Sequence, residues 1–159
     1  MDKLKFMRRA IDLSRQGMRG GYGGPFGCVI VKDGEIVGEG HNEVLATNDP
    51  TAHAEVLAIR RASAKLKTFD LSGCELYVNG TPCCMCMAST LWARISCVYY
   101  ALSEKASDEV GLSDAHLYAE LSRPLDGRQI VPMISMPNLD EEAIAVYREW
   151  LAKPGRATY

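Results

Sequence analysis

The stretch that decides the fold spans residues 75–100 and reads ELYVNGTPCCMCMASTLWARISCVYY. Its first residues, Glu75–Val78, are typical of a short strand. Thr81-Pro82 then has the pattern of a helix cap followed by a first helical residue, so we expect a helix from there to about Ala93. Ile95–Tyr100 is a second apolar strand. A strand, a helix and a strand in this order predict two parallel strands joined by a crossover helix.

The flanking sequence extends this alternation in both directions. Leu4, Met7 and Ile11 recur at helical spacing, which predicts an amphipathic helix at the start of the chain. Asp33-Gly34 is a strong hairpin signal between two strands. The remaining expected elements are strands at Phe26–Val31, 35–41 and, more weakly, 129–134, and helices at Pro50–Leu66, Ser113–Leu121 and Asp140–Ala152.

This order predicts an α/β fold, a three-layer αβα sandwich around a mixed five-stranded sheet with one antiparallel hairpin. A length of 159 residues suits one domain, so we expect residues 1–159 to form a single domain. The last residues, about 153–159, contain Pro and Gly and are expected to form an extended tail.

Composition narrows the function classes. Apolar residues make up 47% of the chain and charged residues 24%, as in ordinary globular proteins. No apolar run approaches the roughly 20 residues that a membrane helix needs, and the N-terminus has no secretory apolar region. The net charge of −2 does not favour a nucleic-acid partner. We therefore expect a cytoplasmic protein without a membrane or nucleic-acid partner.

Two short motifs carry the chemistry, His53-Ala54-Glu55 and Pro82–Cys86, and each lies near the expected start of a helix. Cys83 and Cys86 are three residues apart, so a helix places them on one face. Two thiolates and one imidazole from His53 supply three ligands for Zn²⁺ and leave a fourth position open, which is typical of a catalytic zinc. Glu55 can share this site only if the site lies off the end of the helix, around its first turn.

The cysteine motif has two other interpretations. A Cys-x-x-Cys pair is also compatible with a structural zinc site or a redox pair. A structural site needs a fourth ligand, however, and His41 and His116 are the remaining histidines. A redox pair would leave His53 and Glu55 unexplained. The combination H-x-E…P-C-x-x-C is the signature of zinc deaminases.

The deaminase chemistry follows from these groups. Zinc lowers the pKa of a bound water from about 15.7 towards about 7, so that hydroxide forms in neutral solution. This hydroxide would attack an amino-bearing ring carbon. Glu55 would take a proton from the water and deliver protons to the ring nitrogen and the departing amine. The products would be the oxo ring and ammonia.

Beyond this signature, the sequence resembles the bacterial guanine deaminases of the cytidine/deoxycytidylate deaminase superfamily over nearly the whole chain. The motifs that carry the resemblance are Gly23-Gly24-Pro25-Phe26-Gly27, Asn42, 48–55, Pro82-Cys83-x-x-Cys86 with Trp92-Ala93-Arg94, 111–114 and the C-terminal Tyr159. The resemblance implies a homodimer whose C-terminal segments are exchanged and whose reaction converts guanine to xanthine and ammonia.

The resemblance also implies a set of substrate-binding residues. Asn42 would hold the purine through its side-chain amide, and Phe26 and His53 would flank the ring. The backbone N–H of Ala54 would lie near the ligand, as would that of Cys83. Asp114 would bind the polar edge of the base and assist proton transfer, and Tyr159 would close the site.

Residue by residue, simpler roles also fit. Asn42 could be a turn residue, Phe26 a core residue, Asp114 a helix cap and Tyr159 part of a frayed tail. Thr81 departs from the family, which usually has Glu there, and Cys84 replaces the usual Pro or small apolar residue. Cys28 and Cys97 are expected in the core, whereas Cys74 has no assigned role.

Because Thr81 borders the expected pocket, other substrates stay open. The alternatives are another small aminated ring (cytosine, a triazine or a different aminopurine), a tRNA adenosine and, outside enzymes, a structural zinc module.

Overall fold

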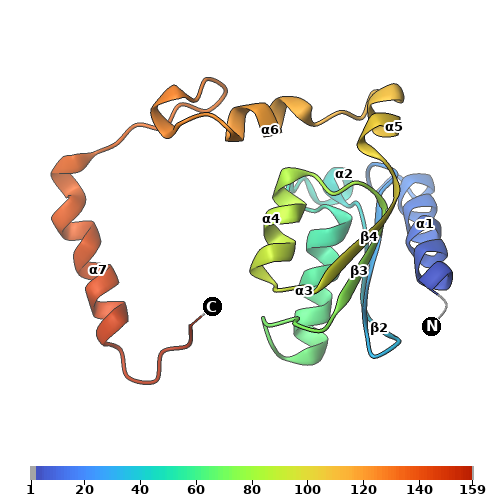
Figure 1. Cartoon of the computed structure of the whole chain (residues 1–159), viewed down its shortest axis with the longest axis horizontal. Helices are drawn as coiled ribbons and strands as arrows, with labels where there is room; N and C mark the ends of the chain where they lie inside the picture. Colours follow the sequence, from blue (N-terminus) through green and yellow to red (C-terminus); the bar gives the residue numbers. More distant parts are fainter. Residues whose placement is uncertain (1–2, 159) are drawn as a thin grey trace. The chain divides into compact units, whose positions relative to one another are not determined.

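The computed structural model describes residues 3–158, and the chain divides into two compact units, Met1–Asp114 and Ala115–Tyr159. Figure 1 shows the elements of both units along the chain. In the part that the structure describes, the first unit holds all the strands and the second unit holds helices and irregular segments.

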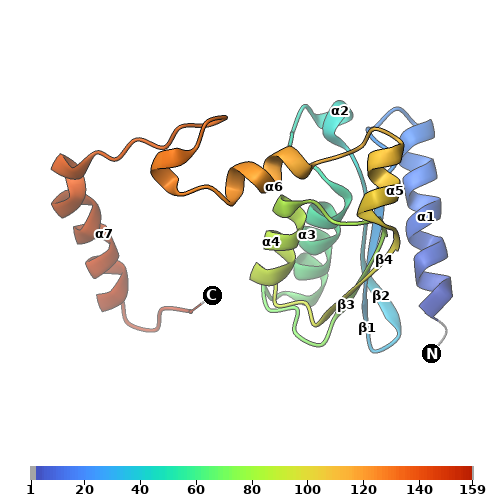
Figure 2. The ribbon, with the colours of Figure 1, turned by 45° about the horizontal axis from the view of Figure 1, so that its top comes forward.

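The first unit is built on a four-stranded sheet with the order β2-β1-β3-β4. β1 (Gly27–Lys32) pairs antiparallel with β2 (Glu35–His41) and with β3 (Glu75–Gly80), and β3 pairs parallel with β4 (Cys97–Leu102). The expected hairpin and the parallel pair are both confirmed. Figure 2 shows the sheet lying between helices.

Helices cover both faces of this sheet, which confirms the three-layer α/β architecture. α1 (Lys3–Arg19) packs Phe6 and Leu13 onto one face. α3 (Ala54–Leu66) lies on the other face, and α4 (Cys84–Trp92) packs beside α3. Alternate residues of β1 serve the two cores: Val29 and Val31 face α1, whereas Cys28 and Ile30 join the core on the side of α3. Two short helices that the sequence did not predict are α2 (Val44–Thr47) and α5 (Glu104–Glu109).

The expected starts of two helices were wrong by several residues. α3 begins at Ala54, not at Pro50, because the Asp49 carboxylate accepts hydrogen bonds from the Thr51 N–H (2.8 Å) and hydroxyl (2.6 Å) and so forms a local turn. α4 begins at Cys84, because the Thr81 N–H and hydroxyl both donate to the Leu102 carbonyl, at 3.0 and 2.9 Å. Thr81 therefore fastens the end of β3 to the end of β4 and does not cap the helix.

The second unit contains α6 (Ala115–Leu121), two 3₁₀ turns (Leu125–Gly127 and Pro137–Leu139) and α7 (Asp140–Ala152), whose predicted bounds are confirmed. The fifth strand expected at residues 129–134 was wrong, because the described residues there form no strand. The N–H groups of Gln129 and Ile130 both donate to Glu120 Oε1 at 2.7 Å, and Pro132 has no N–H to give to a ladder.

Cys97 was also placed wrongly, since it is exposed whereas Cys28 is buried as expected. Cys97 begins β4, the outer strand of the sheet, and α1 lies mainly over β1 and β3. Among residues 3–158, no helix is long and apolar enough to cross a membrane.

Candidate active site

The two motifs expected to carry the chemistry meet where α3 and α4 begin. His53 and Cys83 are the residues that precede these helices, and both have an extended backbone conformation. Glu55 and Cys86 lie in the first turns of α3 and α4 and are buried. Small residues bring α3 close to the sheet: a Cβ added at Gly38 or at Gly40 of β2 would lie 2.4 Å from the carbonyl oxygen of Ala58 or of Ala54, respectively.

The three expected ligand residues form one cluster. The Nδ1 atom of His53 lies 3.6 Å from the Cys83 Sγ atom and 3.5 Å from the Cys86 Sγ atom, and all three ligand atoms lie within 4.8 Å of one another. With zinc–sulfur bonds of about 2.3 Å and a zinc–nitrogen bond of about 2.0 Å, tetrahedral geometry separates nitrogen from sulfur by about 3.5 Å. The donor set and its spacing therefore fit Zn²⁺.

Hydrogen bonds within this cluster shift the pKa values of its three groups. Hydrogen bonds from the Cys86 thiol and from His53 hold the pKa of the Cys83 thiol at about 4. The same bond to Cys83, together with burial, raises the pKa of Cys86. The hydrogen bond to Cys83 also raises the pKa of His53. The cluster thus offers one thiolate outright, and a metal ion that binds there displaces the remaining protons.

Glu55 stands beside this cluster without being one of the three ligands. Its side chain is 5% exposed, and burial raises the pKa of its carboxyl group. Hydrogen bonding with Cys86 acts in the opposite direction. A carboxyl group whose pKa is raised towards neutrality can both accept and return a proton, which is what a general acid–base group needs.

Asn42 and Phe26 are held together next to the strand ends. Asn42 is buried and follows β2, and its Oδ1 atom accepts hydrogen bonds from the N–H groups of Gly24 and Val44, both at 3.2 Å. Its backbone N–H donates to the Phe26 carbonyl at 3.0 Å. With the oxygen so engaged, the side-chain NH₂ is the part of Asn42 available as a donor to a ligand.

The other expected substrate residues have separate positions. Ala54 is the buried first residue of α3, directly beside His53. Asp114 is close enough for its charge to contribute to the raised pKa of His53. Tyr159 lies outside the described residues.

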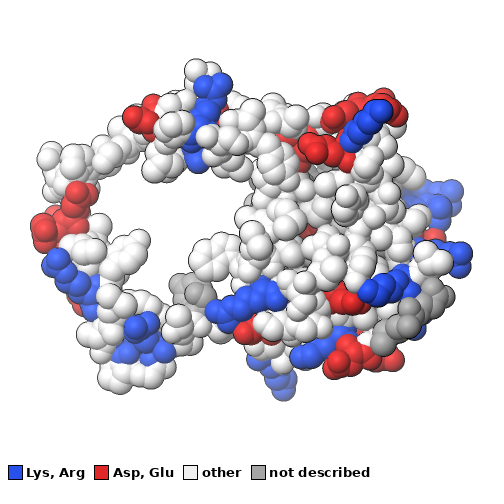
Figure 3. All heavy atoms as spheres, viewed as in Figure 1, with Lys and Arg blue, Asp and Glu red and all other residues white. Residues whose placement is uncertain are grey.

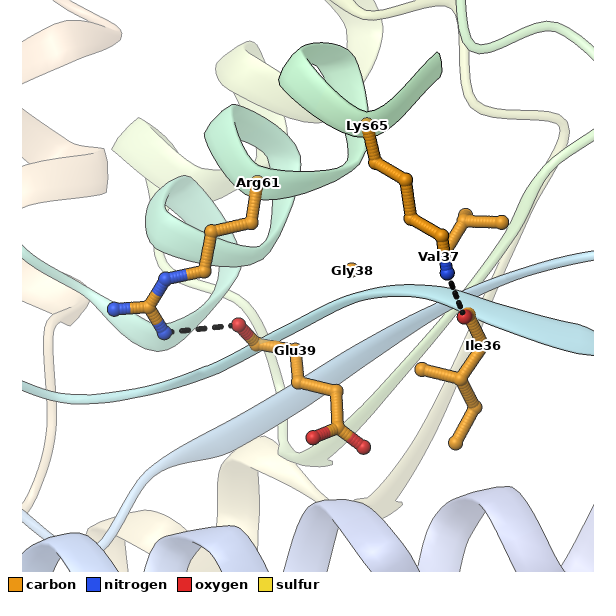
Figure 4. A pocket seen from close by; sticks show the side chains of 6 residues that line it. All are labelled: Ile36, Val37, Gly38, Glu39, Arg61 and Lys65. Carbon is orange, nitrogen blue, oxygen red and sulfur yellow. Dashed lines mark hydrogen bonds between the residues drawn. The ribbon is translucent and has the colours of Figure 1, made fainter.

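A hollow in the first unit lies between β2 and α3 and is shown in Figure 4. Arg61 donates to the Glu39 carbonyl at 2.9 Å and Lys65 to the Ile36 carbonyl at 3.0 Å. Both side chains therefore donate hydrogen bonds to backbone carbonyl groups of β2, an edge strand of the sheet. None of the expected ligands or substrate residues that the structure describes lines this hollow.

Comparison with known proteins places this site in a family. Residues 1–102 match the family described as the cytidine and deoxycytidylate deaminase zinc-binding region. The guanine deaminase of Bacillus subtilis is 45% identical over 130 residues, which cover 82% of this chain and 83% of that protein. The tRNA-specific adenosine deaminase of Aquifex aeolicus is 42% identical over 105 residues, or 66% of this chain and 69% of that protein.

Solved structures show the same likeness. The crystal structure of Bacillus subtilis guanine deaminase has a TM-score of 0.93 at 39% identity and covers 100% of this chain and 99% of that one. The guanine deaminase of Nitrosomonas europaea has a TM-score of 0.65 at 27% identity, with coverage of 93% and 84%. Since the family match includes His53, Glu55 and both cysteine ligands, the chain belongs to the cytidine and deoxycytidylate deaminase family.

Proposed function

We propose that this protein is a guanine deaminase, which hydrolyses the free base guanine to xanthine and ammonia. The observation that carries the proposal is the likeness to Bacillus subtilis guanine deaminase, which extends over the whole chain. The match to the Aquifex aeolicus tRNA-specific adenosine deaminase covers a smaller share of the chain. The C–NH₂ bond of the base breaks, a C=O bond forms with oxygen from water, and no oxidant or reductant is consumed.

His53, Cys83 and Cys86 hold the zinc ion in this proposal. Bound zinc supplies a Lewis acid that makes water a competent nucleophile at neutral pH. Glu55 removes a proton from the attacking water, passes it to the ring nitrogen and delivers a further proton to the departing amine. The burial that raises the pKa of Glu55 supports this role, because the group must be protonated and deprotonated in turn.

The substrate is held by groups around the strand ends. Asn42 donates its side-chain NH₂ to the purine, and Phe26 and His53 flank the ring. The backbone N–H of Ala54 contacts the ligand, and Asp114 binds the polar edge of the base. The contacts between Asn42 and the segment that carries Phe26 support their joint assignment to one pocket.

The protein acts as a homodimer in this proposal, with tail residues of about 153–159 exchanged between subunits and with Tyr159 closing the site. α7 supports this, because it buries none of its residues although it carries Tyr147 and Leu151, which are 68% and 60% exposed. Apolar surface of this kind is typical of association sites. Light scattering should then give a mass twice the 17.5 kDa of one chain, whereas a concentration-independent monomer would exclude the dimer.

We also place the protein in the cytoplasm. All six cysteines are free thiols, and the proposed site depends on two of them staying reduced. The reducing compartment of the cell maintains this state.

The experiment that tests the substrate is an ammonia-release screen over guanine, cytosine, adenine, guanosine, cytidine, a triazine and a tRNA. We expect ammonia from guanine alone. Ammonia from cytosine or a triazine, with none from guanine, would reassign the substrate and keep the chemistry. Ammonia from none of the compounds would favour a structural zinc module.

A further inference from the structure

We propose that Asn79 is a positioning residue that holds Phe26 as one wall of the substrate pocket, an inference that rests on the proposed function. Asn79 lies near the end of β3. The preceding residue, Val78, forms with Cys28 the last backbone pair between β3 and β1. The side chain of Asn79 bridges the two residues that flank Phe26. The Gly27 N–H donates to Asn79 Oδ1 at 2.8 Å, and Asn79 Nδ2 donates to the Pro25 carbonyl at 2.9 Å.

These two side-chain hydrogen bonds continue the contact between β1 and β3 beyond the last backbone pair of the two strands. The pairing of β1 with β3 ends at Cys28 and Val78, Pro25 has no N–H, and the N–H of Phe26 turns back to the Gly24 carbonyl at 2.8 Å, so no regular pairing with β3 continues there. A primary amide offers one acceptor and two donors and can therefore replace a backbone partner. Because one side chain grips the chain before and after Phe26, the backbone of Phe26 is fixed on both sides.

The ring of Phe26 is correspondingly confined. A Cβ added at Gly24 would come within 2.9 Å of the ring, and a Cβ added at Gly80 would approach it to 3.9 Å. Phe26 also accepts the backbone hydrogen bond of Asn42, the residue proposed to hold the base. Asn79 therefore acts through Phe26 and Asn42, and its role is to fix the separation between the ring and the amide that receive the purine.

The test is Asn79→Leu, which keeps the approximate shape of the side chain and removes both bonds. We expect KM for guanine to rise roughly 3- to 10-fold, as for the loss of about one neutral hydrogen bond. The kcat value should change less than about twofold, because the lost interaction holds substrate and transition state alike. Zinc content should be unchanged. Asn79→Asp, which keeps the acceptor for the Gly27 N–H and loses the donor to Pro25, should give an intermediate KM.

Hydrogen exchange gives a readout that does not depend on turnover. The amides of Gly27 and Asn42 should exchange faster in Asn79→Leu than in the unchanged protein. The matched control is Ser96→Ala. Ser96 precedes β4, and its Oγ accepts a hydrogen bond at 2.8 Å from the N–H of Gly73, which precedes β3. This contact lies at the starts of β3 and β4, whereas Asn79 lies near the end of β3. This control loses a comparable bond and should leave KM unchanged.

The outcomes separate the two proposals. An Asn79→Leu variant with unchanged KM and unchanged exchange at Gly27 would overturn the positioning role, and so would an equal rise of KM in Ser96→Ala. If the unchanged protein does not deaminate guanine, the proposed function fails. In that case, exchange at Gly27 and Asn42 still decides whether Asn79 holds the segment.

Discussion

Glu55 is the residue in which burial and chemistry are most directly linked. In Glu55→Ala, the zinc ligands and the fold should persist, because Glu55 is not one of the three clustered ligands. We expect kcat to fall by about 10²- to 10⁴-fold, the usual contribution of a general acid–base group. Steady-state kinetics and zinc analysis on the same sample would measure both effects. Glu35→Ala, at the start of β2, is the matched control and should be fully active; full activity of Glu55→Ala would contradict the proton-transfer role.

The neighbouring cysteines give a second prediction at this scale. Cys83→Ser should lose zinc and activity together, because it removes the thiol that is ionised most easily. Cys84→Ser should keep both, although Cys84 is also partly buried and lies between the two ligands in sequence. Elemental analysis and activity assays after chelation and after renewed addition of zinc would measure this. Zinc retention in Cys83→Ser at the level of Cys84→Ser would argue against the assigned ligands.

The sequence predicted the residues of the metal cluster well, because ligand type and the Cys-x-x-Cys spacing are local properties. It did not predict how Asn79 and Thr81 are used. Their partners, Pro25, Gly27 and Leu102, lie 54, 52 and 21 residues away in sequence, so spacing could not reveal them. An Asn-Gly pair at the end of a strand would suggest a turn from sequence alone, whereas here the Asn side chain binds a distant loop.

At the scale of elements, the contact between β2 and α3 determines where His53 and Glu55 stand. A Cβ at Gly40 would lie 2.4 Å from the Ala54 carbonyl oxygen, so Gly40→Ala must push the start of α3 away from the sheet. We expect a loss of about 1–3 kcal/mol in the free energy of unfolding and weaker zinc retention. Urea denaturation and metal competition would measure the two effects.

The control for this prediction is Gly127→Ala, where an added Cβ meets only Pro124 Cδ, at 3.6 Å. Gly127→Ala should change neither the free energy of unfolding nor zinc retention appreciably. Equal effects of the two substitutions would show that the β2–α3 contact does not position the site.

The pairing of α1 with β2 gives an expected pH dependence. The Arg9 guanidinium donates two hydrogen bonds to the Glu39 carboxylate, at 2.8 and 2.7 Å, and lowers the pKa of Glu39 below 4.5. The stabilisation is therefore present above pH 4.5 and is lost as the pH falls through the lowered pKa. Since both side chains are about one-third exposed, it should not exceed about 1 kcal/mol.

Arg9→Met should thus be less stable than the unchanged protein at pH 7 and equally stable near pH 2, as measured by urea unfolding at both values. A difference that persists undiminished in acid would mean that packing of the Arg9 chain, and not its charge, stabilises the contact.

Among the elements, β2 and α7 were predicted best, and both have the expected bounds, because hydrophobic periodicity is a local property of the sequence. The starts of α3 and α4 were missed because side-chain hydrogen bonds of Asp49 and Thr81 compete with helical ones. The strand expected at residues 129–134 failed for a similar reason, since the Glu120 carboxylate takes two of its N–H groups.

At the scale of the whole molecule, charge and apolar surface determine which partners are suitable. Acidic and basic side chains are both present on the face shown in Figure 3, in keeping with the net charge of −2. The sequence predicted a tail from about Lys153, and the described residues after Ala152 form no helix or strand, while its exchange between subunits stays a prediction. Hydrophobic periodicity cannot distinguish a helix face that packs on its own chain from one that packs on a second chain.

The most direct test of the central claim is the stoichiometry of guanine turnover by the zinc-loaded protein. Guanine, xanthine and ammonia would be followed together by chromatography and an ammonia assay, with Glu55→Ala as the slow reference. We predict that each guanine consumed yields one xanthine and one ammonia, and that the reference forms both at least about 10²-fold more slowly. Guanine that stays intact with fully zinc-loaded protein, while another aminated base releases ammonia, would contradict the assignment.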